Sequence, residues 1–358
     1  MKKTPLFEIH QRLKAKMEPF AGWLMPIQYE SIISEHHWTR NYCSLFDTCH
    51  MGEFIIYGHL KENNLNKVIT ADLESMEIGK CSYGFMLNEK GGIIDDLIVY
   101  KLAEDKWMLV VNAEPLNKDE IHLKNYIKTE IENVSYKTAK LDLQGPLSRE
   151  ILKSIVGQDI DKLKYYHFDY FPILGENVLI SRTGYTGELG YELYINSDKA
   201  VDLWHLLLSN KRVKPAGLGA RDTLRLEMGY PLYGQDITEE TTPLEADLER
   251  FVNFEKEFIG KTALLRQKEV GIKKKLVCLI ASSRRAPRHG YKIYLNNKEI
   301  GFITSGTFSP SLACGIGMGY VEIDYCELGM KVFIKEDKIE IKATITKRPF
   351  YKEGSLRR

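Results

Sequence analysis

The sequence predicts an α+β protein of two or three domains, whose last domain is built from strands. Its 358 residues exceed what one ordinary core requires. Up to residue 230, segments with helical periodicity alternate with short strands joined by hairpin-type links, which favours largely antiparallel sheets. From about residue 270 onward, short strands and glycine-containing turns follow one another, which indicates a separate all-β module.

The composition is that of a soluble globular protein and gives no argument for nucleic-acid or membrane binding. Hydrophobic residues make up 44% of the chain and charged residues 28%. The 50 Lys and Arg residues nearly balance the 49 Asp and Glu residues, which leaves a formal net charge of +1. The chain has no apolar run of the ~18 residues that span a bilayer, and its basic N-terminus lacks the apolar core of a secretory signal. We therefore expect a cytoplasmic protein.

The cysteines favour reduced thiols over disulfides or a metal site. Six cysteines in a chain of this length, with no C-x-x-C pair, are typical of a reducing compartment. Cys43, Cys49 and His50 lie near His36 and His37 in the sequence, but their spacing matches no zinc module. We expect core thiols beside ordinary histidines, and no metal.

The first elements are a helix, a strand and a second helix. SIISEHHWTRN (31–41) begins at a Ser that can cap a helix and has apolar residues near helical spacing. GEFIIYG (52–58) is predicted to be a strand because glycines bound its apolar run. HLKENNLNKVIT (59–70) predicts the second helix.

The next three segments predict an antiparallel sheet. CSYGFMLN (81–88) and DDLIVYKL (95–102) read as strands on either side of the turn NEKGG, whose glycines tolerate positive φ. The short link AED joins the second of them to KWMLVVN (106–112), which predicts a hairpin.

Helices and strands then alternate until residue 230. Pro opens the helix PLNKDEIHLKNYIKT, and Gly-Pro ends the strand TAKLDLQGP before the helix LSREILKSIV. Two strands broken by a glycine turn and two further helices complete this part: NVLISRTGYTGELGYELYI (177–195), DKAVDLWHLLLS (198–209) and ARDTLRLEMGY (220–230), the last ended by Gly229.

Two acids, Asp95 and Asp96, stand directly before the apolar run LIVYKL. Burying an ionised carboxylate is costly unless it is paired or hydrogen-bonded. Because neighbouring side chains of a strand point to opposite faces, one acid can reach solvent while the other faces a cleft. The alternative is that both acids cap the turn after Gly91 and Gly92.

Two other clusters suit a flat ligand with an amide edge. The first is the glycine turn of SRTGYTGELGYEL, which fits neither nucleotide-binding glycine motif and is surrounded by Tyr185, Glu188, Tyr191 and Glu192. Glycines let the backbone approach a ring closely, and tyrosines supply stacking faces with a polar tip.

The second cluster is GLGARDTLRLE (217–227), where Arg221, Asp222 and Arg225 lie near one helical face. One interpretation is a surface ladder of ion pairs. The other is a carboxylate and guanidinium site for a ring such as a pterin or guanine. No nucleophile motif or zinc-protease motif is present, so the residues by themselves do not name a reaction.

Together these segments closely resemble the T-protein, or aminomethyltransferase, family of the glycine cleavage system. The matching segments run in order along nearly the whole chain: TPLFEIH, LFDTCHMGEF with Cys49 at a usual Ser, LNEKGGIIDDLIVY, VVNAE, LQGP, RTGYTGELGYEL, KPAGLGARDTLRLEMGYPLYGQDI, FIGKTAL, PRHGY and TSGTFSPSL. Many segments in register make this resemblance specific.

The resemblance implies a three-domain cloverleaf in which the first two domains interleave in sequence. Residues 1–50 and 139–250 would form domain 1 with the folate pocket, and residues 51–138 would form domain 2, which carries Asp96. A linker at 251–271 would lead to a C-terminal β-barrel or jelly-roll-like domain at 272–358. Tetrahydrofolate is expected in the central channel where the domains meet.

The resemblance also implies the activity. The lipoylated H-protein would present an aminomethyl group, whose methylene passes to tetrahydrofolate as co-substrate. The products would be 5,10-methylenetetrahydrofolate, ammonia and dihydrolipoyl H-protein. A monomer that uses no metal is expected.

By matching positions, Asp96 would lie near N5 and N10 of folate as the catalytic carboxylate, where it stabilises an iminium-like cation as the C–S bond breaks. Asp95 would be structural. Glu192 would hold the 2-amino group and N3–H of the pterin. Further folate-pocket residues would be Arg221, Tyr83, Tyr100, Asn112, Tyr185, Tyr230 and Tyr351. Arg348 is the first candidate for the cation that binds the glutamate tail of folate, an assignment left open because Glu353 stands where related sequences often carry a basic residue.

Three alternatives remain. A folate-dependent demethylase of the same fold would act on a sulfonium or N-methyl substrate. A folate-binding iron–sulfur-maintenance protein would carry the signature K-G-C-Y-x-G-Q-E, where this chain has FIGKTALL. A protein-interaction module would leave the set of Asp96, Glu192 and Arg221 unexplained.

Overall fold

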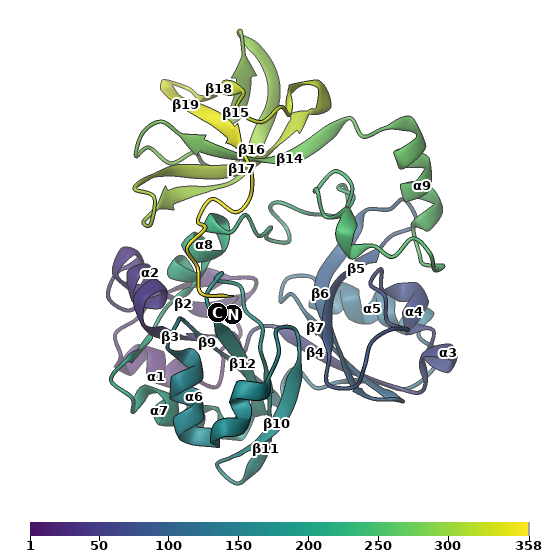
Figure 1. The fold of residues 1–358 in the computed structure, drawn as a ribbon, viewed down its shortest axis with the longest axis vertical. Helices are drawn as coiled ribbons and strands as arrows, with labels where there is room; N and C mark the ends of the chain where they lie inside the picture. The colour runs from purple at the N-terminus through teal and green to yellow at the C-terminus, as the bar shows by residue number, and fades with distance from the viewer. Residues whose placement is uncertain (357–358) are drawn as a thin grey trace.

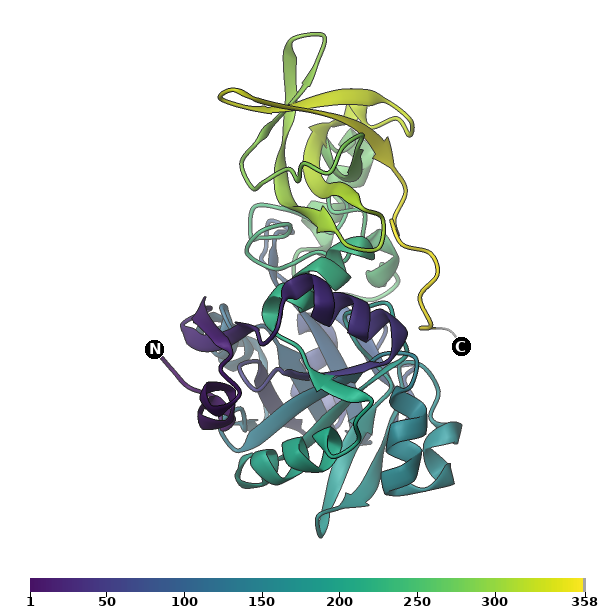
Figure 2. The same ribbon diagram turned by 90° about the vertical axis from the view of Figure 1, so that its left-hand side faces the viewer.

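The structure, a computed structural model, describes residues 1–356. Within these residues the strands form a two-stranded ribbon, a six-stranded sheet, a five-stranded sheet and a closed barrel. Figure 1 shows the barrel at the top, the six-stranded sheet at the lower left and the five-stranded sheet at the lower right. Figure 2 shows, from the side, that the barrel stands on the layer that holds the two sheets. No helix within residues 1–356 is long and apolar enough to cross a membrane.

The six-stranded sheet is formed by chain segments that precede and follow the five-stranded sheet in the sequence. Its order is β10-β11-β12-β9-β3-β13, and β13 pairs in parallel with β3. Leu141 and Leu143 point to one face, where helices α1, α6 and α7 cover the apolar core. The elements are α1 (Phe7–Arg12), β3 (Cys43–Asp47), β9 (Thr138–Gln144), α6 (Ser148–Val156), β10 (Phe168–Ile173), β11 (Glu176–Ser181), β12 (Gly190–Asn196), α7 (Ala200–Leu208) and β13 (Val213–Pro215).

The five-stranded sheet is antiparallel, in the order β5-β6-β7-β4-β8. Phe54, Ile56 and Leu109 face a core that is closed by α3, α4 and α5. The elements are β4 (Gly52–Tyr57), α3 (Leu60–Asn63), α4 (Leu65–Val68), β5 (Cys81–Leu87), β6 (Ile93–Ala103), β7 (Lys106–Val111), α5 (Leu116–Tyr126) and β8 (Ile131–Asn133).

The barrel closes in the order β14-β17-β16-β15-β18-β19, and α8 lies beneath it (Figure 1). Apolar side chains such as Ile293, Ile334 and Ile341 fill its interior. The remaining elements are the ribbon β1 (Lys16–Phe20) and β2 (Trp23–Gln28), the helices α2 (Ile32–Asn41), α8 (Leu218–Glu227) and α9 (Lys261–Val270), and the barrel strands β14 (Lys274–Ala281), β15 (Lys292–Leu295), β16 (Lys298–Ser309), β17 (Cys314–Glu322), β18 (Lys331–Glu336) and β19 (Ile339–Thr346).

After β19 the chain returns from the barrel along α8 to the turn between β11 and β12, as the yellow segment of Figure 1 shows. The backbone N–H groups of Phe350 and Tyr351 donate to the carbonyl of Glu227 at the end of α8. Gly354 packs so closely that an added Cβ would lie 2.3 Å from the carbonyl oxygen of Gly187. This C-terminal segment therefore connects the barrel to the six-stranded sheet.

The predicted α+β class and the C-terminal barrel are confirmed, and three local predictions need correction. Residues 59–70 form two short helices because Asn64 between them adopts φ 68°. Strand β6 begins at Ile93, two residues before the predicted start at Asp95, since pairing with β5 already begins there. The predicted linker 251–271 contains α9. The domain boundaries themselves stay a prediction.

Candidate active site

Asp96 is the centre of a hydrogen-bonded group on the five-stranded sheet. The hydroxyl of Tyr83, on β5, donates to Oδ2 of Asp96 at 2.8 Å. Asn112, directly after β7, donates from Nδ2 to Oδ1 of Asp96 at 2.9 Å. Burial raises the pKa of Asp96 to about 6, although both of these hydrogen bonds lower it. The partly exposed carboxylate is therefore mostly ionised at neutral pH.

Asp95 is fully buried and faces away from solvent. Its oxygens accept hydrogen bonds from the backbone N–H and the Nδ2 of Asn112, at 2.9 and 2.8 Å. The interpretation of the two acids as caps of the turn after Gly92 is therefore wrong. The turn is instead closed by Asn88, whose side-chain oxygen accepts from the N–H of Gly92 at 3.0 Å.

Two of the predicted ligand-binding residues, Tyr185 and Tyr230, form a pair of stacked tyrosine rings. Tyr185 and Tyr230 stack with ring centroids 5.8 Å apart and planes inclined at 26°. The guanidinium of Arg221 lies 5.0 Å from the Tyr185 ring centroid. Burial raises the pKa of the Tyr185 hydroxyl, and charges on both Asp96 and Arg221 also act on it. The turn between β11 and β12 thus places one ring within reach of both charges.

Glu192 and Arg221 belong to a buried ionic network on the face of the six-stranded sheet opposite its apolar core. Nζ of Lys140 lies 2.8 Å from Oε1 of Glu192 and 2.5 Å from Oδ1 of Asp142. Arg221 donates to Oδ2 of Asp142 at 2.7 Å. The hydroxyl of Tyr100 reaches across from β6 to Oε2 of Glu192 at 3.3 Å. This network joins the two sheets at the predicted folate pocket.

Lys140 and Asp142 are site residues that the sequence analysis missed. In β9 they alternate with Ala139, Leu141 and Leu143, a pattern that usually indicates one solvated face. Here that polar face packs against the second sheet, so both charged side chains are almost completely buried. One sequence signal could have identified both residues. A lysine and an aspartate stand two residues apart, and so on the same face, in a strand that ends directly before Gly145.

Some of the predicted side chains lie elsewhere. The C-terminal segment places Tyr351 on the guanidinium of Arg40, 4.3 Å from its ring centroid. Arg348 donates to the carbonyl of Ala246 at 3.0 Å and pairs with Asp247 at 3.2 Å. In the structure both side chains therefore contact other protein groups, and their predicted roles in folate binding stay predictions.

Two residues near the glycine turn and one on α8 are also structural. Tyr191 is buried in the core of the six-stranded sheet, and Glu188 pairs with Arg40 at 2.8 Å. Arg225 is buried and bridges Asp222 and Asp236, each at 2.8 Å, so the surface ladder of ion pairs is not formed.

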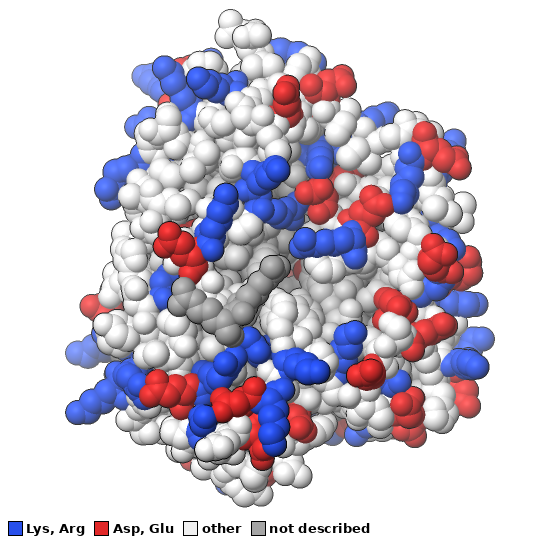
Figure 3. All heavy atoms as spheres, in the orientation of Figure 1, with Lys and Arg blue, Asp and Glu red and all other residues white. Residues whose placement is uncertain are grey.

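The surface around the junction of the three sheets is basic in part. Figure 3 shows several Lys and Arg side chains, with some Asp and Glu side chains among them, around the centre of this face. A patch of this sign favours anionic ligands such as carboxylates.

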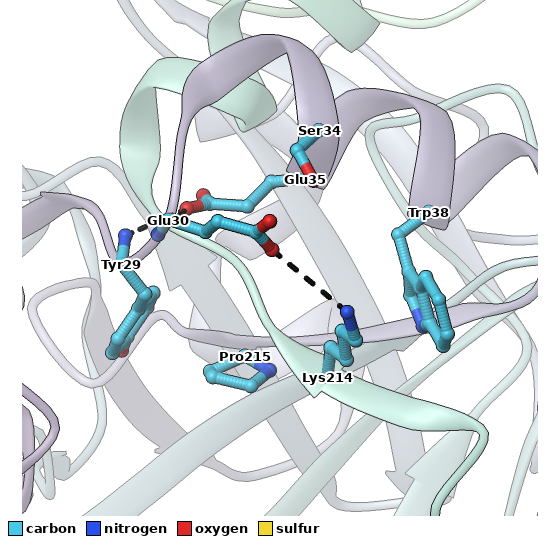
Figure 4. A pocket seen from close by; sticks show the side chains of 7 residues that line it. All are labelled: Tyr29, Glu30, Ser34, Glu35, Trp38, Lys214 and Pro215. Carbon is cyan, nitrogen blue, oxygen red and sulfur yellow. Dashed lines mark hydrogen bonds and ion pairs between the residues drawn. The ribbon is translucent and has the colours of Figure 1, made fainter.

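A separate cavity of about 160 Å³ lies beside α2 and is lined by Tyr29, Glu30, Ser34, Glu35, Trp38, Lys214 and Pro215 (Figure 4). Glu35 points toward the backbone there and accepts from the N–H groups of Tyr29, Glu30 and Gly217 at 2.6, 2.9 and 2.8 Å. Its carboxylate therefore holds three chain segments together, which is a structural role.

Comparison with known proteins agrees with this geometry. Residues 6–256 match the GCVT N-terminal domain family, and residues 274–352 match the glycine cleavage T-protein C-terminal barrel domain family. The chain is 49% identical to an aminomethyltransferase of Halothermothrix orenii, over 98% of this chain and 100% of that one. It is 46% identical to an aminomethyltransferase of Caldanaerobacter subterraneus, over 99% of this chain and 97% of the relative.

The fold also matches a solved structure. The crystal structure of the glycine cleavage system aminomethyltransferase T from Bartonella henselae superimposes with a TM-score of 0.93 at 34% identity, and the match covers 99% of each chain. With family matches along most of its length and curated relatives that it covers almost completely, the chain belongs to the glycine cleavage T-protein family of aminomethyltransferases.

Proposed function

We propose that this chain transfers the methylene of an aminomethyl group, carried on the lipoyl arm of an H-protein, to tetrahydrofolate and releases ammonia. The observation that carries this proposal is the position of Asp96. Asp96 is a residue of intermediate exposure. Its carboxylate is held by Tyr83 and Asn112, and its charge acts on the Tyr185 hydroxyl. Tyr185 stacks on Tyr230 and also contacts the guanidinium of Arg221.

The residues present fit a pterin at this position. Oε1 of Glu192 accepts a hydrogen bond from Nζ of Lys140. Oε2 accepts one from the Thr183 hydroxyl at 2.7 Å and two longer ones, each 3.3 Å, from the hydroxyls of Tyr100 and Tyr194. A carboxylate offers about four acceptor positions. Two parallel N–H donors of a pterin edge can replace the long tyrosine contacts at Glu192.

The positive charge of Lys140 supports this binding role. Charges on Asp142 and Glu192 raise the pKa of Lys140, although burial lowers it, so the ammonium persists at neutral pH. Although burial raises the pKa of Asp142, the charge of Lys140 lowers it. The same ammonium pairs with Glu192 at 2.8 Å, so both buried acids have a cation beside them. Tyr185 and Tyr230 offer apolar ring faces on which a flat heterocycle can pack.

Tetrahydrofolate supplies the nitrogen nucleophile that accepts the methylene. On the protein side, Asp96 provides a fixed negative charge where positive charge develops at the aminomethyl carbon as its bond to sulfur breaks. A preorganised carboxylate stabilises such charge without having to reorient, because Tyr83 and Asn112 already fix both of its oxygens. One folate nitrogen bonds to the carbon as its bond to sulfur breaks, and the second folate nitrogen then displaces the amine as ammonia. The two protons that these nitrogens lose pass to the sulfur, which completes the lipoyl dithiol, and to the departing amine.

A reconstituted assay tests the proposal. Purified protein is mixed with tetrahydrofolate and H-protein loaded with the aminomethyl group, and ammonia and methylenetetrahydrofolate are measured together. We expect equal amounts of both products from the wild type, and formation slower on the order of 10²-fold or more with Asp96→Asn. Formation should be normal with Asp105→Asn, whose side chain is exposed in the β6–β7 link of the same sheet. If a one-carbon group passed to tetrahydrofolate from N-methyl or sulfonium compounds, and none passed from the H-protein, the protein would instead be a demethylase.

A further inference from the structure

Arg40, in the last turn of α2, is a buried cation to which the reaction itself gives no role. Its guanidinium binds two acids at once. Nη1 lies 2.8 Å from Oε1 of Glu188, and Nη2 lies 2.8 Å from Oε2 of Glu227. Nη1 also donates to the carbonyl of Thr186 at 2.6 Å. This one side chain therefore connects the end of α8 with the turn between β11 and β12.

The turn between β11 and β12, residues 182–189, carries Tyr185 and does little to hold its own shape. Within the described part of the chain, this stretch adopts neither helix nor strand, and no backbone–backbone hydrogen bond joins two of its own residues. Its contacts come from other segments. The N–H of Ser355, in the C-terminal segment, donates to Glu188 at 2.8 Å, and Arg40 binds the same carboxylate. The order of the turn thus depends on these outside contacts.

Through Arg40 the turn is tied to the same helix that contacts the Tyr185 ring. The guanidinium of Arg221, near the start of α8, lies 5.0 Å from the centroid of that ring. Glu227, which anchors Arg40, is the last residue of α8. Because Thr186 directly follows Tyr185, the hydrogen bond from Arg40 to its carbonyl holds the backbone beside the ring. The ring therefore keeps one position relative to Arg221 as long as Arg40 holds the turn.

The arrangement requires an arginine and not only a positive charge. A guanidinium presents its N–H groups in a rigid planar fork, whereas lysine ends in one ammonium on a flexible stem. The Tyr351 ring packs on the guanidinium, with its centroid 4.3 Å away. Glu227 is itself held from the barrel side, because the hydroxyl of Ser311 donates to it at 2.8 Å. Buried ion pairs often add little net stability since both charges lose water, and some serve to fix one conformation.

We propose that Arg40 is a positioning residue for folate binding, which holds the turn between β11 and β12 against α8 so that Tyr185 presents its ring to the pterin beside Arg221. This inference rests on the proposed function, because the ring receives a pterin only if the chain binds tetrahydrofolate. Arg40 acts through Thr186 and Glu188 and not by contact with the reacting atoms.

Hydrogen–deuterium exchange of the free protein tests the order of the turn without any ligand. Arg40→Lys keeps a positive charge beside both acids but loses the fork. In this variant the amides of residues 182–189 should exchange on the order of 10-fold faster, while amides of the five-stranded sheet keep their wild-type rates. Arg212→Lys is the matched control, because Arg212 pairs with Glu150 at the surface, 2.8 Å apart. Wild-type exchange of the turn in Arg40→Lys would overturn the proposal, whatever the protein catalyses.

Steady-state kinetics with saturating aminomethyl-loaded H-protein separate positioning from a general loss of stability. Arg40→Lys should raise the KM for tetrahydrofolate on the order of 10-fold and leave kcat within about twofold of wild type, because Asp96 lies on the other sheet. Ile334→Val removes a buried methylene equivalent from the barrel core and destabilises the fold away from the turn, so its KM should not change. A KM that rises equally in both variants, or a kcat that falls at constant KM, would contradict the proposal.

Glu188→Gln keeps the size of the side chain and decides the question if Arg40→Lys does not fold. It should speed exchange of the turn and raise the KM for tetrahydrofolate. In the double variant the two effects on KM should not add, since both substitutions break one contact. Fully additive effects would show that Arg40 does not act through Glu188. If the wild type did not bind tetrahydrofolate, the proposed function would fail, while the exchange data would still show whether Arg40 orders the turn.

Discussion

The Tyr83 hydroxyl donates a hydrogen bond of 2.8 Å to Oδ2 of Asp96, from the neighbouring strand of the same sheet. This contact favours the ionised carboxylate, because a hydroxyl donor stabilises negative charge. It opposes burial, which raises the pKa of Asp96. The hydrogen bonds from Tyr83 and Asn112 thus favour the ionised form of the proposed catalytic acid.

Tyr83→Phe should raise the pKa of Asp96, since it removes a donor to the charged form. A hydrogen bond to a charged group is worth about 1.5 to 3 kcal/mol, so the acidic limb of kcat/KM should move up by about one pH unit or more. The measurement is kcat/KM from pH 5 to pH 9. Tyr136→Phe, at an exposed tyrosine, is the control. An unmoved limb would show that Tyr83 does not set this pKa.

Lys140→Met should destabilise the fold and weaken folate binding together. The substitution leaves Asp142 and Glu192 buried without their cation, and breaking a buried ion pair costs about 3 to 5 kcal/mol. Urea unfolding and a tetrahydrofolate titration measure the two effects.

Lys137→Met serves as the matched control, because Lys137 pairs with Glu132 at the exposed surface. We expect little change in that variant. Wild-type stability in Lys140→Met would contradict a stabilising role of this buried ion pair.

Gly354→Ala should disturb the site through the C-terminal segment. The added Cβ would clash with the carbonyl of Gly187, and the neighbouring Ser355 N–H donates to Glu188 at 2.8 Å. Displacing this segment loosens the turn that carries Tyr185, so folate affinity should fall about tenfold, or 1.4 kcal/mol. Isothermal titration measures it, with the exposed Glu353→Ala as control. Unchanged folate affinity in Gly354→Ala would show that the C-terminal segment does not influence the pocket.

The sequence predicted the fold best where local signals and tertiary context agree. Ser31 caps α2 as expected, with its hydroxyl accepting from the N–H of Ser34. The barrel follows from alternation and turn chemistry over residues 274–346. The short strands β3 and β10 were not predicted. β3 is five residues long and buried throughout, so it carries no alternation to detect.

The site was only partly predictable because its charges are shared across chain-distant segments. The pairing of Lys140 with Glu192, and of Arg221 with Asp142, depends on how strands and helices assemble. A pattern along one segment does not encode such contacts. Arg348 and Tyr351 were assigned to folate by resemblance, and in the structure each contacts other protein groups. Their proposed roles stay predictions.

The most direct test of the central claim is the pH dependence of single-turnover methylene transfer in wild type and Asp96→Asn. The wild-type rate should fall as pH drops through about 6, because protonation removes the negative charge of Asp96. Asp96→Asn should be slower on the order of 10²-fold or more, and its rate should lack this acidic limb. A variant that transfers at the wild-type rate, or that keeps the same limb, would show that the charge of Asp96 does not drive the reaction.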